Sequence, residues 1–126
     1  MPRKRNVGLT QRETEILGIL WEKGPVSVDE ISRHLEGGPA ASTVRTLLGI
    51  MEERGLVKHD GQTYGKLYDA AVKEGSMQGS ALRRLVDSFF AGSTEKMLLR
   101  LVDEGEVDLE QIKRLEQRIR QKRQED

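Results

Sequence analysis

Segment 42-STVRTLLGIM-51 arranges its side chains in two stripes at helical spacing. The apolar stripe is Val44, Leu47, Leu48 and Met51, and the polar stripe is Ser42, Arg45, Thr46 and Gly49. Because residues at i, i+3, i+4 and i+7 share one side of a helix, the segment predicts a helix that packs on one side and is free on the other. We expect this helix to begin at residues 40–42, to continue to Arg54 and to stop at Gly55.

The free stripe consists of short polar side chains and one arginine. Such a surface can enter the major groove of DNA, where arginine can pair with guanine and hydroxyl groups can reach bases or phosphates. The same stripe also fits an ordinary solvated helix face, and taken alone it favours this simpler interpretation. The neighbouring elements of the chain change that balance.

Two helices are predicted before this segment and a hairpin after it. The first helix starts with Thr10 and Glu13 at capping-box spacing and stops at residues 23–25; the second starts with Ser27 and Glu30 and ends at residues 37–39. After Gly55, residues 56–59 and 66–69 have the pattern of two short strands around a polar connector. Three helices followed by a hairpin make the order of a winged helix-turn-helix domain, in which the third helix is the reading element.

The predicted fold is therefore mostly α with a small β-hairpin. We expect a flexible basic arm over residues 1–8, a winged-helix DNA-binding domain over 9–71 and a helical dimerisation region over 72–126. The chain has 126 residues and is only 36% hydrophobic, so part of its apolar surface is expected to bury against another chain.

Helical patterns continue after residue 72, separated by Gly92 and by residues 103–105, and each expected helix carries an apolar stripe. The stripes could fold back as an intramolecular core. A second copy is the favoured partner, because an operator with two half-sites needs two reading helices. The residues predicted for dimerisation are Leu82, Leu85, Val86, Phe89, Leu98, Leu101, Val102, Leu109, Ile112, Leu115 and Ile119.

The charges balance, with 21 Lys and Arg against 21 Asp and Glu, so the net charge gives no general signal for nucleic acid. Residues 1–12 nevertheless hold Arg3, Lys4 and Arg5, which we expect to follow phosphates or to enter the minor groove, although an ordinary chain terminus fits equally well. Lys58 and Lys66 flank the hairpin and are candidate phosphate contacts of the wing, with plain solvation as the commoner alternative.

An enzyme or a metal protein has little support in the sequence. The chain has no cysteine, and its two histidines, His34 and His59, lie far apart without a carboxylate cluster. Segment 61–66 has three residues between its glycines, and Leu67 follows where a phosphate loop needs a hydroxyl group. We therefore expect no catalytic residue, no metal and no cofactor. A membrane span of roughly 20 apolar residues and a signal peptide are both missing from the pattern, so a cytoplasmic protein without membrane contact is expected.

Several stretches together resemble the penicillinase repressor family of winged-helix transcriptional repressors, over nearly the whole chain. The most specific is residues 42–48, which resembles the recognition helix of that family, and residues 13–21, 53–57 and 89–93 match in position. The resemblance implies a bacterial homodimeric repressor that binds palindromic promoter DNA and dimerises through its C-terminal helices. It also implies that Ser42, Thr43, Arg45 and Thr46 face the groove.

Two induction routes of the family do not carry over to this sequence. In the antibiotic-resistance members a membrane sensor leads to cleavage at an Asn-Phe bond, and the matching positions here are Arg100 and Leu101. A related branch senses copper through C-terminal cysteines, and this chain has none. The sequence leaves open the inducer, any upstream sensor or protease, the operator and the regulated genes. It also leaves open an alternative function, a winged-helix adaptor that contacts proteins and does not bind DNA.

Overall fold

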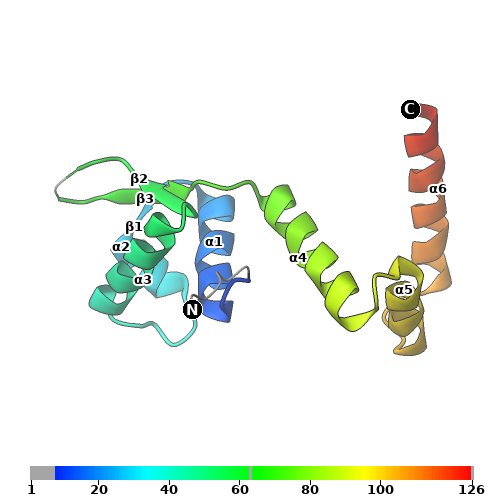
Figure 1. Cartoon of the computed structure of the whole chain (residues 1–126). Helices are drawn as coiled ribbons and strands as arrows, with labels where there is room; N and C mark the ends of the chain where they lie inside the picture. The colour runs from blue at the N-terminus through cyan, green and yellow to red at the C-terminus, as the bar shows by residue number, and fades with distance from the viewer. Residues whose placement is uncertain (1–7, 63, 126) are drawn as a thin grey trace. The chain divides into compact units, whose positions relative to one another are not determined.

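The computed structural model describes residues 8–62 and 64–125, which form two compact units (Figure 1). The first unit ends at Ala81 and the second begins at Leu82. The chain is mostly helical with a small antiparallel sheet, as the sequence predicted. In chain order its elements are α1 (Gln11–Lys23), β1 (Val26–Ser27), α2 (Val28–His34), α3 (Ala41–Glu53), β2 (Val57–His59), β3 (Leu67–Ala70), α4 (Glu74–Phe89), α5 (Thr94–Asp103) and α6 (Leu109–Glu125).

Helix α1 begins and ends at the signals that its sequence contains. The Thr10 hydroxyl oxygen accepts a hydrogen bond from the Glu13 backbone N–H at 3.1 Å, and the Glu13 carboxylate accepts one from the Thr10 backbone N–H at 2.9 Å. The predicted capping box is thus complete. At the other end Gly24 has a φ of 77°, a conformation that favours glycine, and Pro25 follows it.

The sheet has three strands in the order β1-β3-β2, one strand more than the predicted hairpin. Strand β3 is central: Tyr68 is paired with Val26 of β1 on one side and with His59 of β2 on the other. The sequence did not predict strand β1, because two residues are too few to show an alternating pattern. Its second residue, Ser27, also caps α2 by accepting a hydrogen bond from the Glu30 backbone N–H at 3.2 Å. The extra strand joins the hairpin, which we call the wing, to the helical part of the unit.

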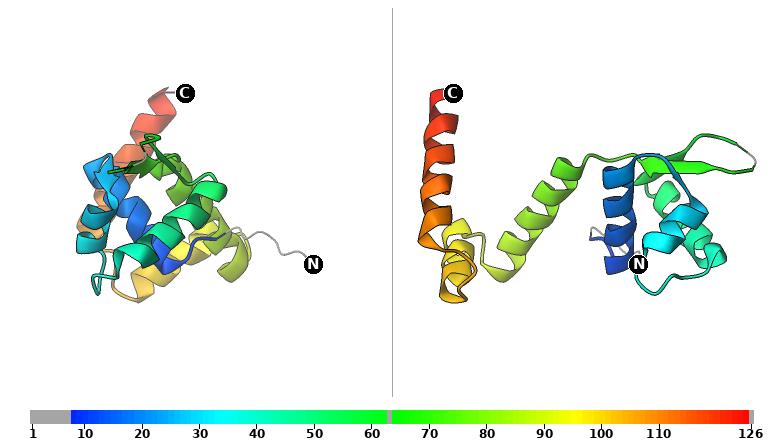
Figure 2. Two further views of the ribbon diagram at one scale, coloured as in Figure 1. Left: turned by 90° about the vertical axis from the view of Figure 1, so that its left-hand side faces the viewer. Right: turned by 180° about the vertical axis from the view of Figure 1, so that it is seen from behind.

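The core of the first unit lies between α1, α2, α3 and the sheet (Figure 2). Burial of an aliphatic side chain of this kind contributes about 1.5–3 kcal/mol relative to its exposure to water. The indole N–H of Trp21 donates to the Val72 carbonyl oxygen at 3.0 Å and so links α1 to the segment before α4. Seven side chains of this core are fully buried: Ile16, Leu17, Leu20, Ile31, Val44, Leu48 and Met51.

The second unit contains the end of α4 together with α5 and α6. Gly92, with a φ of 79°, lies between α4 and α5, and Gly105, with a φ of 75°, lies between α5 and α6. Asp108 and Gln111 cap the start of α6 by exchanging two side-chain to backbone hydrogen bonds of 2.8 Å. The predicted separators of the C-terminal helices are therefore confirmed.

Candidate nucleic-acid interface

Helix α3 has one buried side and one exposed side, as its two stripes predicted. Val44, Leu48 and Met51 have an exposed fraction of 0%, and Leu47 is half-buried. On the other side the four residues predicted to face the groove are all exposed: Ser42, Thr43, Arg45 and Thr46. The Thr46 hydroxyl donates to the Ser42 carbonyl oxygen at 3.1 Å, so its oxygen stays available as an acceptor. The helix thus offers hydroxyl groups and one guanidinium to any partner that lies along it.

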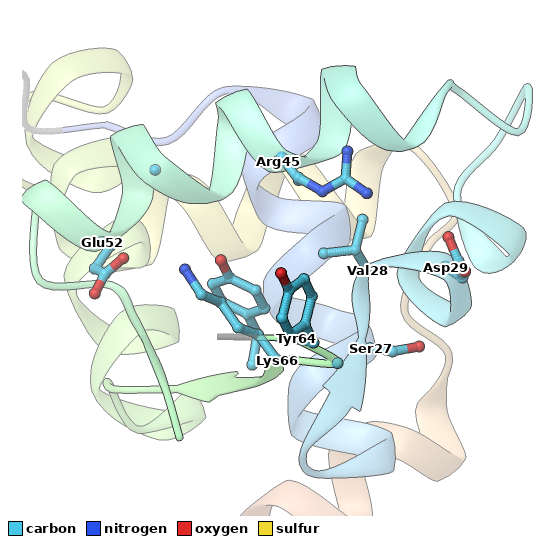
Figure 3. A pocket seen from close by; sticks show the side chains of 10 residues that line it. Ser27, Val28, Asp29, Arg45, Glu52, Tyr64 and Lys66 are labelled. Atoms are coloured by element: carbon cyan, nitrogen blue, oxygen red, sulfur yellow. The ribbon is translucent and has the colours of Figure 1, made fainter. Parts of the chain in front are cut away.

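A groove of about 600 Å³ runs between α3 and the wing. Figure 3 shows Arg45 reaching into it from α3, while Tyr64 and Lys66 rise from the hairpin on the opposite side. Two acids, Asp29 and Glu52, also line the groove. The structure thus brings together an arginine, a lysine and a phenol from segments that are distant in sequence, and these are groups that donate hydrogen bonds to phosphate oxygens.

The two lysines of the wing lie in different environments. Lys66 lines the groove and is partly buried. Lys58 is exposed and lies between Val57 and His59 in β2, so its side chain points to the face of the strand opposite theirs. Of the two predicted phosphate contacts of the wing, the structure brings only Lys66 to the groove that contains Arg45.

The predicted arm residues Arg3, Lys4 and Arg5 lie outside the described residues. The structure does describe Gly8, the residue at which the arm joins the domain. A guanidinium N–H of Arg54, the C-cap residue of α3, donates to the Gly8 carbonyl oxygen at 3.1 Å. The chain therefore enters the domain beside the C-terminal end of α3.

A polar contact holds the start of the wing connector against α3. His59 Nε2 lies 3.2 Å from Glu52 Oε2, and His59 Nδ1 accepts a hydrogen bond from the Gly61 backbone N–H at 2.9 Å. The His59 ring also meets the Tyr68 ring edge-on, with their centroids 5.5 Å apart. The His59 side chain thus contacts the last turn of α3, the start of the connector and the central strand β3.

Sequence reasoning missed several groups of this site. Tyr64 was placed only in a polar connector, and the folded structure is needed to show that its side chain is exposed and lines the groove with Lys66. His59 was considered only as a metal ligand. No local pattern could have revealed its contact with Glu52, because that contact depends on how the hairpin folds back on α3.

Residues 9–121 match the sequence profile of the family described as Penicillinase repressor. The chain belongs to the penicillinase repressor family. This is a family of transcriptional repressors and not of enzymes, so the chain is a transcriptional regulator by family.

Relatives of this family member include a penicillinase repressor from Staphylococcus aureus, which is 20% identical over 113 residues, covering 88% of this chain and 90% of the relative. Among solved structures, a MarR family protein from Bacillus stearothermophilus is similar at 21% identity and a TM-score of 0.47, over 90% of this chain and 76% of that chain. A point mutant of ZitR from Lactococcus lactis is similar at 17% identity and a TM-score of 0.46, over 97% of this chain and 80% of that chain.

In this member of the family the C-terminal helices expose most of the residues predicted for dimerisation. Val86 differs from the rest, because it is buried within its own chain with an exposed fraction of 8%. An apolar groove lies between the end of α4 and α5, lined by Leu82, Leu85, Phe89, Phe90, Met97, Arg100 and Leu101. Ten predicted residues are exposed: Leu82, Leu85, Phe89, Leu98, Leu101, Val102, Leu109, Ile112, Leu115 and Ile119. Over the described residues, the helices are all too short or too polar to span a bilayer.

Proposed function

We propose that this chain is a transcriptional repressor that binds palindromic operator DNA as a homodimer, with α3 in the major groove and the wing beside it. The observation that carries the proposal is the two-sided structure of α3, whose apolar stripe is fully buried at Val44, Leu48 and Met51 while Arg45 and its polar neighbours are exposed. A major groove admits an α-helix, and short polar side chains let the helix approach the base edges closely.

The exposed residues of α3 have distinct chemical capacities in this proposal. The Arg45 guanidinium can donate two parallel hydrogen bonds to O6 and N7 of guanine. Ser42, Thr43 and Thr46 carry hydroxyl groups that can pair with bases or phosphates. Gly49, one turn after Arg45, has no side chain that would hold the helix away from DNA. We therefore assign sequence reading to Arg45 and its neighbours on α3.

The wing supplies contacts to the DNA backbone in the same proposal. Lys66 and Tyr64 line the groove beside Arg45, and both can donate a hydrogen bond to a phosphate oxygen. Contacts of this kind position the protein and add affinity that falls with salt, but they carry little sequence information. The basic arm, Arg3, Lys4 and Arg5, joins the domain beside the end of α3, which supports a similar role for it.

The exposed apolar residues of the C-terminal helices support dimerisation. Ten large apolar side chains are too many for a chain of this size to leave in water. A second copy would cover them, and it would carry a second α3 to the other half of a palindromic site. Two linked reading helices also bind more tightly than one, because the second contact forms at a high effective concentration. Since a transcriptional regulator acts on the chromosome, the proposal also includes a cytoplasmic location.

Footprinting of the full chain on its own upstream intergenic DNA tests the proposal. A protected stretch with two symmetric halves supports a dimeric repressor and gives the spacing of its half-sites. A titration of labelled duplex at low and high salt separates this function from a protein-binding adaptor, which predicts no salt-dependent binding. If a chain shown to be folded by circular dichroism binds neither this DNA nor random duplex at low salt, the DNA-binding proposal is wrong.

A further inference from the structure

We infer that His59 is a positioning residue for DNA binding: it fixes the wing against α3, so that Lys66 and Tyr64 stand beside the reading helix. This inference rests on the proposed function. It goes beyond that function because His59 itself needs no contact with DNA.

Both nitrogen atoms of the His59 ring are engaged. Nδ1 accepts the Gly61 backbone N–H at 2.9 Å, so this nitrogen carries no proton. The ring proton therefore lies on Nε2, which donates to Glu52 Oε2 at 3.2 Å. An imidazole with its proton on Nε2 satisfies both neighbours at once, and its ring packs edge-on against Tyr68.

The hairpin needs such a support at this position. Strands β2 and β3 have three and four residues, and β2 is at the edge of the sheet. Strand β1 supports β3 on one side, whereas β2 pairs with β3 alone, so the outer end of β2 depends on its contacts with α3. Beyond His59 the described hydrogen bonds of the connector centre on Asp60, which accepts from the backbone N–H groups of Gln62 and Leu67 at 3.2 and 3.4 Å and donates its own N–H to the Leu67 carbonyl oxygen at 3.2 Å. The contact from Glu52 through His59 to Gly61 thus connects α3 to the base of the loop that carries Tyr64 and Lys66.

The charge of Glu52 gives the contact a second consequence. Glu52 lines the same groove as Arg45 and Lys66, where a free carboxylate would repel DNA phosphates. The hydrogen bond from His59 Nε2–H holds one carboxylate oxygen of Glu52 toward the wing. It does not remove the negative charge of Glu52 from the groove. Glu52→Gln keeps an oxygen acceptor for His59 and removes the charge. If the contact positions the wing through a hydrogen bond, this variant keeps the wing in place and binds DNA more tightly than the unchanged chain.

Hydroxyl-radical footprinting and affinity measurements on operator DNA test the inference with the full chain. His59→Ala is expected to lose backbone protection at the edges of each half-site, where the wing lies, and to keep protection at the centre, where α3 lies. The affinity should fall about 5- to 10-fold, the size expected for one or two lost hydrogen bonds, and the salt dependence should become shallower. His59→Gln, which can still donate to Glu52, should recover part of the edge protection.

The matched control is His34→Ala, which removes the other histidine of the chain. His34 lies on α2, is exposed and does not line the groove. Its variant should have the footprint and the affinity of the unchanged chain. If His59→Ala does not fold, Glu52→Ala breaks the same contact from the α3 side and should give the same loss at the edges. Nitrogen-15 NMR of the ring should show the proton on Nε2 whether or not DNA is present.

Each result has a definite meaning. An unchanged footprint for His59→Ala and Glu52→Ala, or uniform loss across centre and edges, overturns the positioning role while operator binding by the unchanged chain stands. A ring proton found on Nδ1 overturns the described contact without any DNA measurement. If the unchanged chain binds no duplex, the proposed function fails and the role of His59 in DNA binding fails with it.

Discussion

Arg54 donates two hydrogen bonds from one guanidinium nitrogen to the two carboxylate oxygens of Glu13, at 3.0 and 2.9 Å. The Glu13 side chain has an exposed fraction of 6%, and that of Arg54 has 33%. Glu13 also completes the capping box of α1, while Arg54 caps α3 and holds the Gly8 carbonyl oxygen. One buried carboxylate therefore fixes the end of α3 against the start of α1.

We expect Arg54→Ala to lower the free energy of unfolding by about 1.5–3 kcal/mol, the range for hydrogen bonds to charged groups. The physical reason is that the substitution leaves the buried Glu13 carboxylate with only its Thr10 hydrogen bond. Urea denaturation followed by circular dichroism measures the change. Arg33→Ala, at an exposed position of α2, serves as the control and should change stability by less than about 0.5 kcal/mol. Equal stability of both variants would show that the pair contributes nothing.

The sequence was sufficient for the parts of the fold that local signals determine. Three such signals each involve residues within one or two helical turns of each other, and the sequence predicted all three. They are the cap at Thr10, the glycine after α3 and the two stripes of α3. The Arg54 pair shows where such reasoning ends, because its partners lie 41 positions apart. Both residues had been noted as parts of family-like stretches, but nothing local says that they meet.

The candidate site shows the same limit. Arg45 was identified because its neighbours in sequence are also its neighbours on the helix. The difference between Lys58 and Lys66 depends on which face of the hairpin turns toward α3, and this is a tertiary property. The strand β1 was missed for a related reason, since a two-residue strand is defined by its partner in β3 and not by its own residues.

Arg45→Ala should weaken binding to operator DNA by about 1–3 kcal/mol, which is roughly 5- to 150-fold, if Arg45 pairs with a guanine. The loss on random duplex should be much smaller, because base pairing by arginine depends on sequence. Arg45→Lys is the informative companion variant, since it keeps the charge and loses the bidentate geometry. Fluorescence anisotropy at fixed salt measures all affinities. Equal losses on operator and random DNA would assign Arg45 to a phosphate instead.

The lysines of the wing make a matched pair in one hairpin. Lys66→Ala should weaken binding to operator and random duplex by a similar factor, and should reduce the slope of log affinity against log salt by about 1. Lys58→Ala should change both quantities less, because Lys58 lies on the face of β2 opposite His59 and outside the groove. Titrations at several salt concentrations measure the slopes. A larger effect at Lys58 would mean that the other face of the wing contacts the DNA.

The dimer prediction can be tested at Phe89, which is at the end of α4 with an exposed fraction of 79%. Light scattering at micromolar concentration should give the unchanged chain twice its mass of 14.2 kDa. Phe89→Glu should give the mass of one chain, because an interface that buries this position would also bury an unpaired carboxylate. It should also lose most of its operator affinity, since a single α3 reads only half of a palindrome.

Gln117→Glu is the control for this variant, because it adds the same charge to α6 outside its apolar stripe and should leave the dimer intact. A single-chain mass for the unchanged protein would mean that dimerisation, if it occurs, requires DNA, and a dimeric Phe89→Glu would place the interface on other residues of the C-terminal helices.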